Sequence, residues 1–102
     1  MRLRTAAGRL LTRVEHWGQS RWSQRADRGQ TRAEAVYRLV QRLADLVAAA
    51  EGRPALAVPR LDNDLALPDQ VRVMVTDLGL AGAGDDVLLV AAAEIEETSA
   101  RL

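Results

Sequence analysis

Four closely spaced arginines near the N-terminus suggest a charged binding surface. Arg21, Arg25, Arg28 and Arg32 follow one another at intervals of four, three and four residues, and Trp22 lies among them. Guanidinium groups bind carboxylates and phosphates through paired hydrogen bonds, and tryptophan is frequent at the centre of protein interfaces. The segment therefore predicts a surface that binds an acidic partner, which is either a protein or a nucleic acid.

The distribution of charge favours a protein partner. Residues 1–60 contain twelve arginines and five acidic residues, whereas residues 61–102 contain two arginines and nine acidic residues. The arginines can thus pair with the acidic half, within one molecule or between two, or they are simply solvated. A pI of about 6.6 is low for a protein whose whole surface binds a polyanion. We expect a protein partner, a second copy of the chain among the candidates, and keep nucleic acid as the alternative.

The other residues that could act in catalysis or metal binding do not form a recognisable site. His16 is the single histidine, and its sequence neighbours do not supply the partners that metal or nucleophilic sites need. Asp62, Asp64 and Asp69 offer oxygen ligands for a divalent cation, but acidic residues beside a proline are typical of turns and caps. With no cysteine and no glycine-rich phosphate loop in the sequence, we predict no catalytic activity, no metal and no cofactor.

The elements that position these side chains are predicted to be helices. Residues 1–17 show apolar side chains at helical spacing, and this face places Trp17 in the core. Its basic flank also fits a helix that lies on a membrane surface, which we keep as a further alternative. Met1 and Val14 are both open as the true start, since a valine codon can initiate translation in a GC-rich gene, and a start at Val14 would make this helix an artefact. With a start at Met1, residues 1–17 are a candidate detachable N-terminal helix. The apolar face consists of Leu3, Ala7, Leu10, Val14 and Trp17.

The helix predicted over residues 32–51 is the best defined element. Thr31 and Glu34 have the spacing of a capping box, and Gly52 with Pro54 favours an end to the helix there. Its apolar stripe predicts the centre of the core. The residues expected there are Val36, Val40, Leu43 and Val47.

Two further helices are predicted in the C-terminal half. Pro68 and Asp69 suit a first helical turn, which favours a helix through Gly79, although residues 70–77 also alternate as a strand would. A last helix is expected over residues 86–100, with a cap from the aspartate that precedes it, Asp85.

The connections complete the expected fold. Residues 18–30 are predicted to form a polar connector with Trp22 as its aromatic anchor. Residues 52–67 contain two prolines and predict an extended connection, whose Leu56, Val58 and Leu61 are expected to lie on the core. No apolar run reaches the roughly 18 residues of a membrane span.

The predicted fold is therefore all-α, a single-domain bundle of three to four helices over residues 1–102. The function that we expect is that of a non-catalytic, cytoplasmic protein-interaction or adaptor protein. Its predicted binding residues are Arg21, Trp22, Arg25, Arg28 and Arg32.

Overall fold

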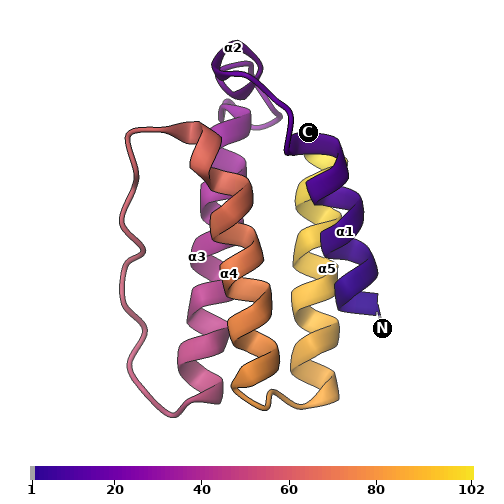
Figure 1. Ribbon diagram of the computed structural model, residues 1–102, viewed down its shortest axis with the longest axis vertical. Helices are drawn as coiled ribbons and strands as arrows, with labels where there is room; N and C mark the ends of the chain where they lie inside the picture. Colours follow the sequence, from indigo (N-terminus) through magenta and orange to yellow (C-terminus); the bar gives the residue numbers. More distant parts are fainter. Residues whose placement is uncertain (1) are drawn as a thin grey trace.

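Four long helices build the protein. The computed structural model describes residues 2–102, in which the long helices are α1 (Arg2–Val14), α3 (Arg32–Ala50), α4 (Leu67–Leu80) and α5 (Asp85–Arg101). A single helical turn, α2 (Gln19–Trp22), and a 3-10 turn, η1 (Asp64–Ala66), lie at one end of the bundle (Figure 1). The predicted all-α bundle with an extended connection is confirmed.

The four helices form two parallel pairs. α1 packs along α5, and both run in the same direction. α3 packs along α4, and both run in the opposite direction (Figure 1). The two pairs then meet through contacts of α3 with α5 and of α1 with α4. Alanines on α1 and α5, among them Ala6 and Ala91, are buried, and such small side chains allow two helix backbones to approach closely.

Because α3 and α4 are parallel, residues 51–63 must return along the whole bundle. Two side chains of α3 hold this segment: Tyr37 Oη donates to the carbonyl of Val58 at 2.5 Å, and Gln41 pairs with its backbone twice. Gln41 Nε2 donates to the carbonyl of Leu56 at 3.0 Å, and Gln41 Oε1 accepts from the Val58 amide at 2.7 Å. Val58 packs against the core. The predicted burial of Leu56 and Leu61 is wrong, because both side chains are exposed.

The start of α3 follows its sequence signals. Glu34 N donates to Thr31 Oγ1 and Thr31 N donates to Glu34 Oε1, both at 3.0 Å, so the capping box is confirmed. The helix ends at Ala50, and Gly52 has the φ of +70° that favours glycine at this place,.

The segment that could have been a strand is helical. Pro68 stands in the first turn of α4, followed by Asp69, where a missing N–H and a negative charge are both favourable. The cap of α5 differs from the prediction. Gly84 is its N-cap residue, without a side-chain hydrogen bond, and Asp85 lies in the first turn.

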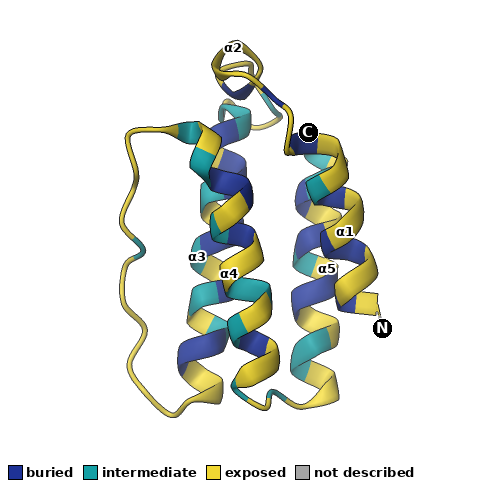
Figure 2. Cartoon of the chain, viewed as in Figure 1, coloured by how far each residue is buried: buried dark blue, intermediate teal, exposed yellow. Residues whose placement is uncertain are grey.

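The core runs the length of the bundle between the pairs of helices (Figure 2). The predicted burial of Val36, Val40, Leu43 and Val47 is confirmed. The apolar face of α1 is part of this core, so it is not free to lie on a membrane surface. Within the part of the chain that the structure describes, no helix is both long and apolar enough to cross a bilayer.

Candidate partner-binding surface

The arginine end of the bundle, defined here as residues 15–32, is built on two packed tryptophans. Trp22 is 0% exposed and Trp17 is 8% exposed. Their rings pack edge to face, with centroids 5.0 Å apart and an interplanar angle of 70°. The prediction that Trp22 contacts a partner directly is therefore corrected, because its ring lies beneath the surface. The predicted burial of Trp17 in the core is confirmed, although α1 ends at Val14 and Trp17 lies beyond the helix.

Two of the predicted arginines lie on the ring of Trp17. The guanidinium carbon of Arg32 is 4.9 Å from its centroid, and that of Arg21 is 5.8 Å away. Such cation–π contacts contribute about 0.5–2 kcal/mol, more where the cation is desolvated. Arg32 is half-buried, and its Nε has no hydrogen-bond partner among residues 2–102. Trp17 thus positions Arg21 and Arg32, a role without a local sequence signal, because Trp17 lies between α1 and α2 and shares no helix with either arginine.

The other two arginines stand on a small hairpin. Ala26 N donates to Gln30 O at 2.8 Å, Arg32 N donates to Gln24 O at 2.8 Å, and an isolated bridge joins Arg25 to Thr31. At its tip Arg28 has a φ of +58° and Gly29 a φ of +72°. Positive φ at both central residues is the requirement of a type I′ turn.

This hairpin gives Arg25 and Arg28 different surroundings. Arg25 Nη1 donates to the carbonyl of Gly29 at 2.8 Å, which ties the side chain to the hairpin. Arg28 instead lines a cavity between α3 and α5. The structure therefore brings all four arginines to one end of the bundle, but it divides them between the Trp17 ring, the hairpin and the cavity.

The four arginines are not neutralised by the acidic half of the chain. Within residues 2–102, Arg21, Arg25, Arg28 and Arg32 form no ion pair. Five of the nine carboxylates of residues 61–102 are instead bound by other arginines. The ion pairs at the long helices are Arg2–Glu96, Arg42–Glu94, Arg72–Glu15, Arg72–Asp69 and Arg101–Glu97.

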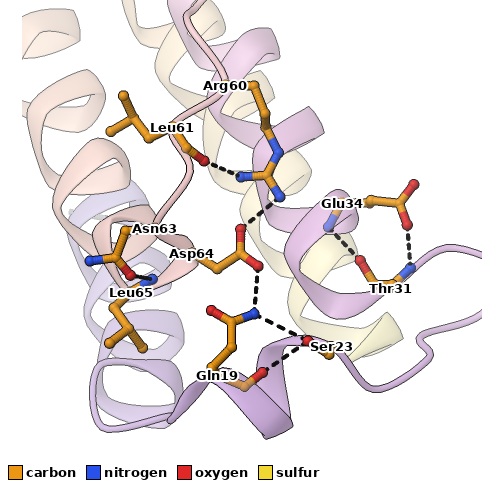
Figure 3. Close-up of polar contacts among 9 residues, drawn as sticks. All are labelled: Gln19, Ser23, Thr31, Glu34, Arg60, Leu61, Asn63, Asp64 and Leu65. Atoms are coloured by element: carbon orange, nitrogen blue, oxygen red, sulfur yellow. Dashed lines mark hydrogen bonds and ion pairs between the residues drawn. The ribbon is translucent and has the colours of Figure 1, made fainter.

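Two carboxyl groups help to hold the arginine end in place. Asp64 of η1 accepts hydrogen bonds from Gln19 Nε2 at 2.9 Å and pairs with Arg60 at 2.7 Å (Figure 3). Burial raises the pKa of Asp64, but these hydrogen bonds outweigh it and leave the pKa below its usual value. The backbone hydrogen bond from Thr31, with the nearby charge of Arg25, lowers the pKa of Glu34.

The opposite end of the bundle is acidic. The turn from α4 to α5 lies there (Figure 1), flanked by Asp77, Asp85 and Asp86. Within the described residues these three carboxylates form no ion pair. Leu80, beside them, is 81% exposed. The molecule thus has arginines without ion pairs at one end and carboxylates without ion pairs at the other.

The histidine and the aspartates that were considered for catalysis or metal binding do not form a site. The His16 side chain is exposed and lies 3.5 Å from Glu15. Asp64 and Asp69 are paired with arginines, and no group of three histidine or acidic side chains in residues 2–102 has the arrangement of a metal site.

No protein-family model matches this sequence, and the comparisons with curated proteins and with solved structures also give no match. The function must therefore be argued from the geometry of the arginine end.

Proposed function

We propose that the protein is a non-catalytic, cytoplasmic binding or adaptor protein whose arginine end contacts an acidic surface of another protein. The observation that supports this proposal is that Arg21, Arg25, Arg28 and Arg32 share one end of a rigid bundle without forming ion pairs there. Charges of this kind steer the approach of a partner and fix its register more than they add affinity. Trp22 supports the surface from below.

A second copy of the chain is one partner that fits. Its acidic end carries Asp77, Asp85 and Asp86 next to the exposed Leu80. The arginine end of one molecule and the acidic end of another are complementary in charge. Such a contact joins two different surfaces, and it builds rings or open chains of molecules.

The proposal is tested by sedimentation velocity over a range of protein and salt concentrations. We expect association that weakens with salt, because exposed charges are screened. The double variant Arg21→Gln/Arg25→Gln should lose this association. The matched control Arg4→Gln/Arg9→Gln removes the same charge from α1 and should keep it. If both variants associate like the wild type, the arginine end is not the contact surface.

If the wild type stays monomeric, the partner is a different protein. Cross-linking from an arginine-end position, such as Ser23, should then capture a protein that the Arg21→Gln/Arg25→Gln variant does not capture. Capture of the same proteins by the variant and by the wild type would contradict the proposal.

The alternative, nucleic-acid binding, uses the same arginines. Its test is binding to duplex DNA as salt is raised, since each phosphate contact adds to a steep loss of affinity. The burial of both tryptophans disfavours a single-stranded ligand, because the stacking of bases needs an exposed aromatic ring. Weak binding to duplex DNA already at low salt would remove this alternative.

A further inference from the structure

A cavity lies between α3, α5 and the tip of the hairpin. Its volume is about 180 Å³, far above the ~10–15 Å³ that a single water needs, so it has room for a polyatomic anion. Arg28 of the hairpin, Arg38 and Arg42 of α3, and Arg101 of α5 line its wall. Four arginines therefore line one small space.

Two of these arginines are neutralised and two are not. Arg42 Nη1 contacts both carboxylate oxygens of Glu94, at 2.7 and 2.9 Å, and Arg101 pairs with Glu97 and lies 3.9 Å from Asp27. Within the described residues, Arg28 and Arg38 form no ion pair. The wall of the cavity, which includes both glutamates, thus carries a net charge of about +2, four arginines against two carboxylates.

The type I′ turn holds the backbone of Arg28 in an unfavourable conformation. Its φ of +58° is a conformation that is unfavourable for a residue with a side chain and that glycine or asparagine adopts more easily. The turn places Arg28 in the wall of the cavity.

Neutral hydrogen-bonding groups complete the wall. Gln30 contributes an amide, and the nearly buried Thr98 contributes a hydroxyl group. A tetrahedral dianion can accept hydrogen bonds from several such donors at once, and its charge balances the excess of two. A single carboxylate carries half of that charge and has only two oxygens to be bound.

We propose that this cavity binds a phosphate dianion, either free phosphate or a phosphate monoester of a larger molecule. The site shares Arg28 with the arginine end, but its other cationic groups belong to α3 and α5. The phosphate site can therefore be tested separately from the proposed protein partner.

The test is a titration with inorganic phosphate at constant ionic strength, followed by NMR of backbone amides and arginine Nε–H groups. We expect saturable shifts at Arg28, Gln30, Arg38 and Thr98. Arg38→Gln should weaken binding by at least about tenfold, because it removes a charged donor. Arg4→Gln, an equal loss of charge on α1, should leave binding within about twofold. Equal effects of both variants, or no saturable shifts, would overturn the proposal.

Two further variants separate binding from folding. Arg28→Gly relieves the positive φ, so the thermal midpoint should stay the same or rise while phosphate binding falls. Glu97→Gln frees Arg101 from its carboxylate and should strengthen binding several-fold. Binding that is unchanged in both variants would contradict the site, whereas Arg21→Gln/Arg25→Gln should bind phosphate normally even where it loses a protein partner.

The charge and the source of the ligand are tested in separate arms. A phosphate monoester loses its second charge near pH 6 and inorganic phosphate at a higher pH, so the binding of either should weaken between pH 8 and pH 5, whereas sulfate, which stays a dianion, should bind at both. The charged groups that face the ligand are Arg28, Arg38, Arg42, Arg101, Glu94 and Glu97. A phosphoserine peptide that binds more tightly than free phosphate identifies a monoester as the natural ligand, and the reverse order identifies free phosphate. Phosphate binding that does not weaken at pH 5 would rule out the dianion.

Discussion

The two long connections of the bundle, residues 15–31 and 51–63, are ordered in different ways. The first folds on itself, with backbone hydrogen bonds across a hairpin and the Trp22 side chain buried in the core. The second is extended, and the side chains of Tyr37 and Gln41 hold its backbone from α3. The first connection therefore has a shape of its own, whereas the second takes its shape from the helix beneath it.

This difference explains which connection can carry a binding surface. A surface needs side chains in fixed positions, and the arginine end obtains them from Trp17 and from the hairpin. The second connection exposes 71% of Leu56, and the hydrogen bonds from α3 that hold it go to its backbone. We interpret it as a tether, and the following substitutions test the contrast.

The largest effect is expected for Trp22→Ala. Loss of a fully buried tryptophan should lower the free energy of unfolding by about 3–5 kcal/mol, a large part of the ~5–15 kcal/mol of a typical domain. Leu56→Ala, in the second connection, should change it by less than about 0.5 kcal/mol. Urea unfolding measures both. Similar losses in the two variants would show that the connections do not differ as described.

A smaller effect is expected for Gln41→Ala. It removes two hydrogen bonds to the backbone of residues 51–63, each worth about 0.5–1.5 kcal/mol. Hydrogen exchange of the Val58 amide and proteolysis between residues 52 and 62 should both become faster. The control Gln24→Ala is the same type of substitution in the first connection, and it should alter neither the exchange of the Val58 amide nor the proteolysis. Unchanged protection of Val58 in Gln41→Ala would mean that the tether is held by other contacts.

Thr31→Ala tests the junction between the hairpin and α3. The loss of the capping bond to Glu34 N should lower stability by about 0.5–2 kcal/mol, and Thr31→Gly should lower it less. Thermal unfolding of the two variants gives the comparison. Negligible effects in both would show that the cap contributes little to α3.

The smallest effect concerns Asp64, which links the two connections through Gln19 and Arg60 (Figure 3). Because its pKa is lower in the folded state, the charged form adds stability above its usual pKa of about 4, and this stability is lost as the pH falls through the folded value. The stability difference between the wild type and Asp64→Asn should therefore shrink from pH 7 to pH 3. A difference that stays constant would show that the charge of Asp64 is not involved.

The helices could be predicted because their signals are local. Thr31 and Glu34 define the start of α3 within one turn, and Pro68 with Asp69 decided between helix and strand for α4. The exposure of Leu56 could not be predicted in this way. Pro54 and Pro59 favour a polyproline-like chain with three residues per turn, in which side chains two apart, such as Leu56 and Val58, do not share a face.

The candidate sites were less predictable because they join distant parts of the chain. The sequence indicated four arginines and a nearby tryptophan, but the choice between Trp17 and Trp22 as their support depended on tertiary packing. Arg28, Arg38 and Arg101 line the same cavity. No spacing in the sequence indicates that α3 and α5 pack together there.

The parallel pairing of α1 with α5 has a consequence for synthesis in the cell. Seventy residues separate the end of α1 from the start of α5, and a ribosome needs roughly 4–14 s to add them at about 5–20 residues per second. During this time the apolar side chains of α1, such as Leu3 and Leu10, lack the helix along which they finally pack. The nascent chain therefore exposes the hydrophobic face that α1 packs along α5 until α5 has emerged, and α1 is the helix that we expect a chaperone to bind.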